Sequence, residues 1–128
     1  MVDERGQVEL IDVERELGVT FPVDYGTFVV GNEGVDRDFG GSWLMLYRLD
    51  QLVDLNRACD MSQSHPGLVF IGSDGGGEGV GFDFRTTPPR IVLVNFVSSG
   101  WTEALIQAPS FDDFMEQRTS GLPYDFGA

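Results

Sequence analysis

The sequence predicts a single domain of mixed α and β structure. Its 128 residues can bury one conventional hydrophobic core without disulfides or a metal. Apolar residues recur at helical spacing in several segments, and between them lie β-branched runs bounded by glycine and proline. We expect residues 8–119 to form the core of the domain and residues 120–128 to form an irregular tail.

Two helices are expected near the N-terminal end. In residues 8–17, leucine and valine recur at helical spacing among acidic residues, and Gly18 follows where a C-terminal cap belongs. Pro22 suits the first position of a second helix, and the apolar residues from Phe21 onward fall on one of its faces. Residues 31–34, Gly-Asn-Glu-Gly, should end this helix.

A loop, a strand and a third helix are expected next. Residues 34–42 are turn formers and charged residues, so they predict a mobile surface loop. Residues 43–47 predict a strand. The third helix should begin with Asp50 as its N-cap and end near Cys59, and a polar linker at residues 61–67 should follow it.

Residues 68–84 are the most informative segment, because a short apolar run meets a glycine-rich turn and then an alternating run. The pattern predicts two strands joined by a glycine loop. The structural glycines of this loop are Gly72, Gly75, Gly76 and Gly77. The last three are expected to supply positive φ angles, while Asp74 accepts hydrogen bonds from the turn's own backbone. The spacing does not fit G-x-G-x-x-G, and a phosphate loop needs a lysine, which the chain lacks.

The remaining elements are further strands and a last helix. Residues 90–97 carry the strongest strand signal, because β-branched residues dominate them. Residues 102–107 could add a fifth strand. Ser110 is expected to cap the last helix, with Asp113 three residues later as a weaker form of the capping box.

The chain is strongly acidic, with 21 Asp and Glu against 8 arginines and a formal net charge of -13. The acids extend from Asp3 to Asp125, which indicates an acidic folded body. Binding to nucleic acid needs clustered Lys or Arg, so we expect no direct contact with nucleic acid. Basic proteins and cations are the partners that such a charge attracts.

Cysteine usage and hydropathy indicate a cytoplasmic protein. Cys59 is the single cysteine, so the chain cannot form an internal disulfide. The first residues contain no apolar signal-peptide core, and the longest aliphatic run is residues 91–94. That run is far shorter than the roughly 20 residues that a membrane-spanning helix requires, so no membrane contact is expected.

Several short motifs occur in a definite order along the chain. They are Leu17-Gly18, Phe21-Pro22-x-x-Tyr25-x-x-Phe28, Asn32-Glu33-Gly34, Leu49-x-x-Leu52-x-x-x-x-Asn56, Phe70-Ile-Gly-Ser-Asp-Gly-Gly-Gly77 leading into Gly81-Phe-Asp-Phe84, the strand from Ile91 to Val94, and Ala108-Pro-Ser-Phe-x-x-Phe114. Their order and number resemble the SUKH superfamily. This superfamily includes fungal cell-wall assembly regulators of the SMI/KNR type and many bacterial immunity proteins. The resemblance covers about Leu10 to Gln117.

The resemblance implies an α+β domain in which helices pack on one face of a curved antiparallel sheet of about four to six strands. It also implies a surface that binds other proteins. For bacterial members it implies neutralisation of a toxin delivered by a competing or sibling cell, often a nuclease or another enzyme that modifies nucleic acid.

The residues favour binding over catalysis. His65 is the only histidine, which excludes histidine metal clusters, and we expect it to face solvent in a loop. Asp74, Glu78 and Asp83 could bind a hard cation such as calcium, but their spacing does not match the EF-hand pattern. The chain offers no convincing nucleophile, so we expect no catalytic residues, no metal and no cofactor.

Each of the two tryptophans needs separate treatment, because tryptophan is both a core residue and a frequent anchor of protein interfaces. Trp43 lies inside a predicted strand and is expected to be partly in the core. Trp101 follows Ser98-Ser99-Gly100, so exposure and burial are both open. An exposed Trp101 among carboxylates would form an interaction site. The expected partner-binding residues are Asp36, Asp38, Phe39, Asp74, Glu78 and Trp101.

Three functions remain open. The first is an immunity protein that neutralises a basic toxin by direct binding, with its carboxylates mimicking nucleic acid. The second is a regulatory scaffold that resembles the fungal SMI/KNR proteins and binds housekeeping or signalling proteins. The third is a cation-binding or small enzymatic domain centred on Asp74 and Glu78. The sequence does not indicate which toxin or which oligomeric state.

Overall fold

The computed structural model describes residues 4–31 and 34–127. Its helices are α1 (Glu4–Leu17), α2 (Val23–Gly31), α3 (Leu52–Cys59) and α4 (Phe111–Thr119), and short 3-10 helices span Leu49–Gln51 and Trp101–Glu103. Its strands are β1 (Val35–Asp38), β2 (Trp43–Leu46), β3 (Leu68–Ser73), β4 (Glu78–Asp83), β5 (Arg90–Asn95) and β6 (Leu105–Ala108). The predicted α+β class is confirmed. Within the described ranges, every helix is too short or too polar to cross a membrane.

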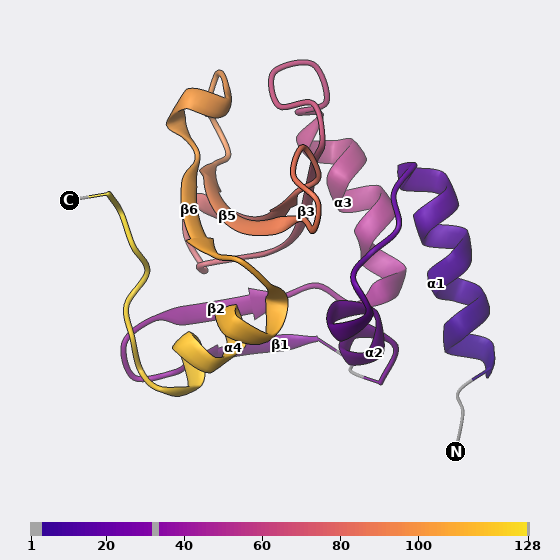
Figure 1. The fold of residues 1–128 in the computed structure, drawn as a ribbon, viewed down its shortest axis with the longest axis horizontal. Coiled ribbons are helices and arrows are strands. Elements are labelled where there is room, and N and C mark those ends of the chain that lie inside the picture. Colours follow the sequence, from indigo (N-terminus) through magenta and orange to yellow (C-terminus); the bar gives the residue numbers. More distant parts are fainter. Residues whose placement is uncertain (1–3, 32–33, 128) are drawn as a thin grey trace.

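The six strands form one antiparallel sheet whose spatial order follows the chain order, from β1 at one edge to β6 at the other. The sheet is strongly curved, and β1 and β2 run across the direction of β5 and β6 (Figure 1). The shortest junction joins β2 to β3 through two residue pairs, Met45–Ser73 and Leu46–Gly72. The β1–β2 hairpin therefore depends on very little backbone pairing for its position on the rest of the sheet.

Most predicted elements are present, with shifted boundaries. Ser110 caps α4 as expected, because its Oγ accepts a hydrogen bond from the Asp113 amide at 3.1 Å. The α3 helix begins after a 3-10 turn, so Gln51 is its N-cap and the assignment of Asp50 was wrong. The strand expected at residues 102–107 begins at Leu105, after the second 3-10 turn. Two residues of the predicted helix end, 32 and 33, lie outside the described ranges.

The prediction of a mobile loop at residues 34–42 was wrong. Residues 35–38 form β1, which pairs with β2 along its whole length. Local propensity misses this strand because Asp is depleted in strands, whereas pairing with an apolar neighbour overrides that preference. Since β1 is an edge strand, its exposed charges on Asp36, Arg37 and Asp38 discourage pairing with another chain.

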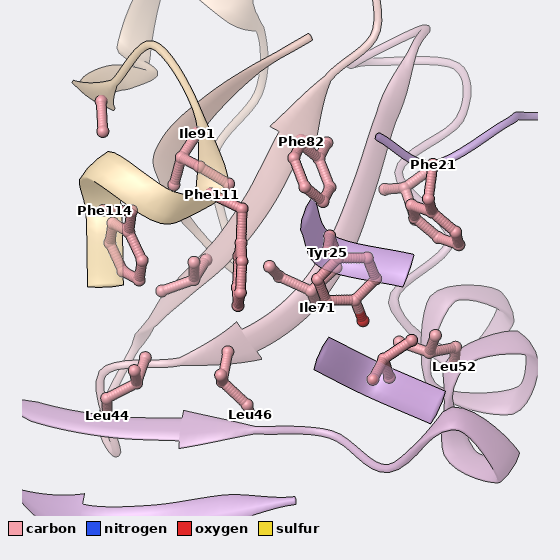
Figure 2. Close-up of a cluster of buried hydrophobic side chains, with 14 of the residues drawn as sticks. Phe21, Tyr25, Leu44, Leu46, Leu52, Ile71, Phe82, Ile91, Phe111 and Phe114 are labelled. Carbon is pink, nitrogen blue, oxygen red and sulfur yellow. The ribbon is translucent and has the colours of Figure 1, made fainter. Parts of the chain in front are cut away.

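The main core lies between one face of the sheet and the helices, and it includes residues of α1, α2, α3 and α4. Figure 2 shows side chains of the sheet facing Tyr25 of α2, Leu52 of α3 and Phe111 and Phe114 of α4. Tyr25 is at its centre, with its ring centroid 5.1 Å from that of Phe111 and 5.3 Å from that of Phe82. Edge-to-face contacts of this kind add roughly 0.5–1.5 kcal/mol beyond burial. The apolar face predicted for the second helix is therefore the face that packs on the sheet.

The Tyr25 hydroxyl is buried and has no hydrogen-bond partner among the described residues. Burial also raises the pKa of Tyr25. An unpaired buried hydroxyl costs roughly 1–3 kcal/mol, so Tyr25→Phe should leave the free energy of unfolding unchanged or raise it by about 1 kcal/mol. Tyr124→Phe is the matched control, because it removes the bond of 2.7 Å to the Trp43 carbonyl and should lower stability by about 1 kcal/mol. Urea denaturation compares the two, and a less stable Tyr25→Phe would contradict the assignment.

The other face of the sheet is covered by loops. A small cluster of Met61, Phe70, Val92 and Val94 lies there under the segment that joins β5 to β6. The β4 strand presents Gly79 on this side, where a Cβ atom would lie 2.2 Å from the Phe70 ring. Glycine is therefore required at this position, because the Phe70 ring lies directly over the β4 backbone.

Candidate functional site

Trp43 is the most exposed large aromatic residue on the sheet, with 44% of its surface accessible. Its indole Nε1 donates a hydrogen bond of 2.7 Å to Asp36 Oδ1 on the neighbouring strand. The ring also rests against Gly75, where a Cβ atom would lie 2.8 Å from Trp43 Cδ1. These two contacts hold the indole in place while leaving much of it open to solvent. Trp43 was expected to lie at least partly in the core, and it belongs to neither cluster of buried core residues.

The strand register places several carboxylates around this indole. Asp36 is opposite Met45, and Asp38 is opposite Trp43. Since side chains alternate along a strand, these residues share one face, whereas Leu44 and Leu46 point into the core. We define the hairpin face as Asp36, Asp38, Trp43, Met45, Asp74 and Gly75. It contains three carboxylates and no basic residue.

Asp74 belongs to this face through the turn between β3 and β4. Its Oδ1 accepts hydrogen bonds from the Gly76 amide at 2.8 Å and the Glu78 amide at 3.2 Å, which confirms the predicted role of its side chain. Gly75 has a φ of +82°, as expected. The same expectation for Gly76 and Gly77 was wrong, because neither has a positive φ. The turn is thus ordered by Asp74 and one left-handed glycine.

Two of the expected binding residues lie at the margin of the hairpin face. Phe39 is half-buried against the main core, with the Arg37 guanidinium 4.5 Å from the centre of its ring. Glu78 is half-buried, and its Oε1 accepts a hydrogen bond of 2.8 Å from Asn95. Both side chains are therefore engaged within the molecule.

Trp101 lies outside the hairpin face, against Pro66 and Arg85. Its Nε1 donates to the Pro66 carbonyl at 2.9 Å, and the Arg85 guanidinium stacks over its ring at 3.8 Å. Pro66 and Arg85 flank the ends of β3 and β4 that are opposite the glycine turn. A strand of six residues is roughly 20 Å long, so Trp101 is not part of the hairpin face.

His65 is fully buried, so the prediction of a solvent-facing histidine was wrong. Its two ring nitrogens lie 2.7 Å from Ser64 Oγ and 3.0 Å from Ser98 Oγ, and its ring packs edge-on against Trp101. The segment at residues 61–67 therefore supports the loop at residues 96–104. The lone histidine has a structural role here.

Asp83 is also fully buried. It is the last residue of β4, whereas Glu78 is the first. Burial alone would raise the pKa of this carboxyl, but hydrogen bonds from Arg85 and Arg90 outweigh it and hold the pKa below its usual value. Asp83 is thus separated from Asp74 and Glu78. Among the described residues, no three His, Cys, Asp or Glu side chains lie close enough to share a metal ion.

The C-terminal segment supports the hairpin face from behind. Tyr124 donates to the Trp43 carbonyl, and its ring stacks on the guanidinium of buried Arg118 at 4.0 Å. A Cβ atom on Gly41 would lie 1.9 Å from the Gly121 carbonyl oxygen, so the hairpin turn and the segment after α4 touch through their backbones. Residues 120–127 contain no helix or strand, yet they contact the β1–β2 hairpin through Gly121 and Tyr124 and bond to Gln107 of β6 through Asp125.

The hairpin face combines an exposed aromatic ring with negative charge, which is the chemistry that suits a positively charged protein surface. A partly exposed, immobilised tryptophan gives a large contact area at low entropic cost. Carboxylates around it favour basic residues and speed their approach. Sequence reasoning missed Trp43 because residues 43–47, Trp-Leu-Met-Leu-Tyr, are apolar at every position, so the pattern does not show which side faces solvent.

Comparison with known proteins relates this arrangement to a family. The model of the SMI1 / KNR4 family (SUKH-1) matches residues 7–117. The match includes the hairpin face and ends within α4, so Arg118 and Tyr124 lie beyond it. No curated protein matches the chain.

Proposed function

The chain belongs to the SMI1 / KNR4 family (SUKH-1), and on that premise we propose that it is a non-catalytic protein-binding domain that neutralises a bacterial toxin by direct binding. The observation that carries this proposal is the hairpin face, where Trp43 is exposed among three carboxylates. A toxin that acts on nucleic acid needs a basic surface to hold phosphates. An acidic protein that covers this surface blocks the enzyme by occupying the place of its substrate.

The proposed contact residues are Asp36, Asp38 and Asp74, as expected from the sequence, with Trp43 in the role that was expected of Trp101. The overall charge supports a basic partner. Within the described ranges, ion pairs involve only four acidic residues, Asp12, Glu16, Asp50 and Asp83, so most of the negative charge is uncompensated. The protein would act in the bacterial cytoplasm, where the toxin reaches its target.

The decisive experiment combines capture with neutralisation. Tagged protein is used to capture partners from lysate of its source organism, in parallel with a Trp43→Ala/Asp36→Arg/Asp74→Arg variant. Each captured protein is then expressed with and without the chain. The proposal predicts that one captured domain stops growth when expressed alone, that the wild-type chain restores growth, and that the variant does not. The Trp101→Ala variant is the control and should still restore growth.

Other results would contradict the proposal. Capture of housekeeping or signalling proteins that are not toxic would favour the regulatory scaffold. If the triple variant still neutralised the toxin and substitutions on another surface abolished neutralisation, the protein would be an immunity protein whose binding site lies outside the hairpin face.

The association rate with the toxin should depend strongly on salt. Exposed charges act over about 10 Å at 0.1 M ionic strength and only about 3 Å at 1 M, so salt screens the attraction. We expect the association rate constant to fall at least tenfold between 50 mM and 500 mM salt, with a smaller change in the dissociation rate constant. Stopped-flow measurements across this range test the expectation. An association rate that does not change with salt would exclude electrostatic attraction as the basis of recognition.

A further inference from the structure

A second acidic surface lies outside the hairpin face, where α1 and α3 end. The two helices run side by side in the same direction and both end near the loop that leads to β3 (Figure 1). Their last residues, Leu17 and Cys59, line a cleft of about 270 Å³. The C-terminal end of a helix carries a partial negative charge of about half an elementary charge. Two negative helix ends therefore meet at this cleft.

Charged side chains add to this negative potential. Glu16 and Asp60 line the cleft, together with the basic residue Arg57. Arg57 is already engaged, because its Nη2 lies 2.7 Å from Glu16 Oε2. The Asp60 carboxylate is exposed and has no hydrogen bond or ion pair among the described residues. The cleft thus holds one carboxylate that no basic group compensates.

Asp60 departs from two local preferences. It has φ 45° and ψ 53°, and in the described ranges it is the single non-glycine residue with positive φ. Glycine is the usual residue at such a helix end. A carboxylate is also unfavourable at the negative end of a helix, where a cation is preferred. The Asp60 amide donates the usual capping bond to the Asn56 carbonyl, but no side-chain contact offsets these two costs, so the carboxylate has the character of a group that acts on a partner.

The floor of the cleft is apolar. Leu17, Met61, Leu68 and Phe70 contribute to its lining. Its volume is below the roughly 300 to 1,000 Å³ of sites for small molecules, so it suits a single side chain. Lysine and arginine carry a long apolar stem and a cationic end, and they bury the stem along apolar surface while the charge stays at the polar rim. This shape and polarity match the cleft.

We propose that this cleft is an anchor site for one arginine or lysine side chain of a protein partner. The stem lies on Met61 and Leu68, and the cationic group meets Asp60 and the ends of α1 and α3. The inference rests on the proposed function in one respect, since a basic toxin would supply the side chain. Its chemistry can be tested without that toxin.

The test is an NMR titration of the ¹⁵N-labelled protein with N-acetyl-arginine methylamide. A single side chain should bind with a dissociation constant of roughly 1 mM or weaker. We expect shifts of the backbone amides at residues 16–19 and 59–62. The neutral isostere N-acetyl-citrulline methylamide should cause no such shifts at the same concentration, because it lacks the positive charge.

Three variants locate the interaction. Asp60→Asn keeps the side-chain shape and should raise the dissociation constant at least threefold. Asp54→Asn is the matched control, because it makes the same charge change on an exposed residue of α3 that does not line the cleft. Asp60→Gly should weaken binding and yet raise the urea midpoint of unfolding, since glycine fits the left-handed backbone and removes the carboxylate from the helix end.

The proposal is overturned if citrulline and arginine cause equal shifts, if shifts spread evenly over the acidic surface, or if Asp60→Asn binds as well as Asp54→Asn. The proposal is also overturned if the arginine probe causes no shifts at any concentration up to its solubility limit. Failure to find a toxin would leave this titration unaffected, so the two proposals can fail separately.

Discussion

Replacement of both Arg85 and Arg90 by methionine is expected to lower the free energy of unfolding by about 3–5 kcal/mol, the range for a buried charge that loses its partners. Asp83 is fully buried and accepts four hydrogen bonds at 3.0–3.1 Å, three of them from the two guanidinium groups and one from the Arg85 amide. Methionine preserves much of the apolar contact of each arginine. The loss of stability therefore measures the cost of burying the Asp83 carboxylate without a cation.

The charge argument predicts a rescue by a third substitution. Adding Asp83→Asn to the double variant removes the buried charge and should recover part of the lost stability. The Arg15→Met/Arg48→Met variant makes the same charge change at two exposed ion pairs and should cost about 1 kcal/mol or less. Urea denaturation at pH 7 measures all of these variants. A triple variant no more stable than the double variant would show that packing, and not charge, causes the loss.

The dependence on pH gives an independent check. In the wild type the pKa of Asp83 is lowered by folding, so the ionised carboxylate stabilises the folded state. Its contribution to the free energy of unfolding is complete above the usual carboxyl pKa of about 4 and is lost as the pH falls through the lower pKa of the folded state. In the double variant the carboxylate is buried without a cation, so protonation relieves the penalty. The difference in the free energy of unfolding between the two proteins should have its full value of about 3–5 kcal/mol at pH 7 and should shrink toward pH 3. A constant difference would contradict the assignment to Asp83.

The Gly72→Ala substitution is expected to destabilise the protein by about 3 kcal/mol, at the upper end of the range for overpacking. A Cβ atom at this position would lie 2.0 Å from the Met45 carbonyl oxygen and 3.1 Å from the Leu46 Cα. These are backbone atoms of β2, so no side-chain movement can relieve the clash. The two strands would have to separate at the short junction that holds the β1–β2 hairpin.

Gly76→Ala in the adjoining turn is the matched control. A Cβ atom there would meet only Asp74 Oδ1, at 3.4 Å, and Gly76 has no positive φ. Its effect should stay within about 0.5 kcal/mol, as for ordinary surface substitutions. Hydrogen exchange should show faster exchange in β1 and β2 of Gly72→Ala and not of Gly76→Ala. Equal stability of the two variants would mean that β2 and β3 can separate without cost.

Local patterns predicted the helices because their apolar spacing and caps act over only a few residues. Ser110 shows this, since its capping bond reaches an amide three positions away. The turn at Asp74 was predictable for the same reason, as its side chain bonds amides two and four residues later. In contrast, β1 was missed because its strand state depends on pairing with β2, and its own charged residues favour no regular structure.

The candidate site could be predicted only in part. Asp36, Asp38 and Asp74 were identified as exposed acids, but their grouping depends on the pairing of β1 with β2 and of β2 with β3. Trp101 was chosen as the binding tryptophan and Trp43 was expected to lie partly in the core, because the residues that contact the two rings, Arg85 and Gly75, belong to other segments. His65 was misjudged for the same reason, as its partner Ser98 lies 33 residues away.

The sequence by itself determined the α+β class, the acidic body, the Ser110 cap of the last helix and the hydrogen bonds of Asp74 in the glycine turn, together with the resemblance to a family that the comparison with known proteins confirmed. These properties follow from composition, from periodicity and from contacts within a few residues. Only the tertiary structure decided which tryptophan is exposed, that Asp83 and His65 are buried, and that the ends of α1 and α3 meet at one cleft. Such features arise from contacts between residues far apart in the chain, and their geometry is set when the sheet curves and the helices pack on it.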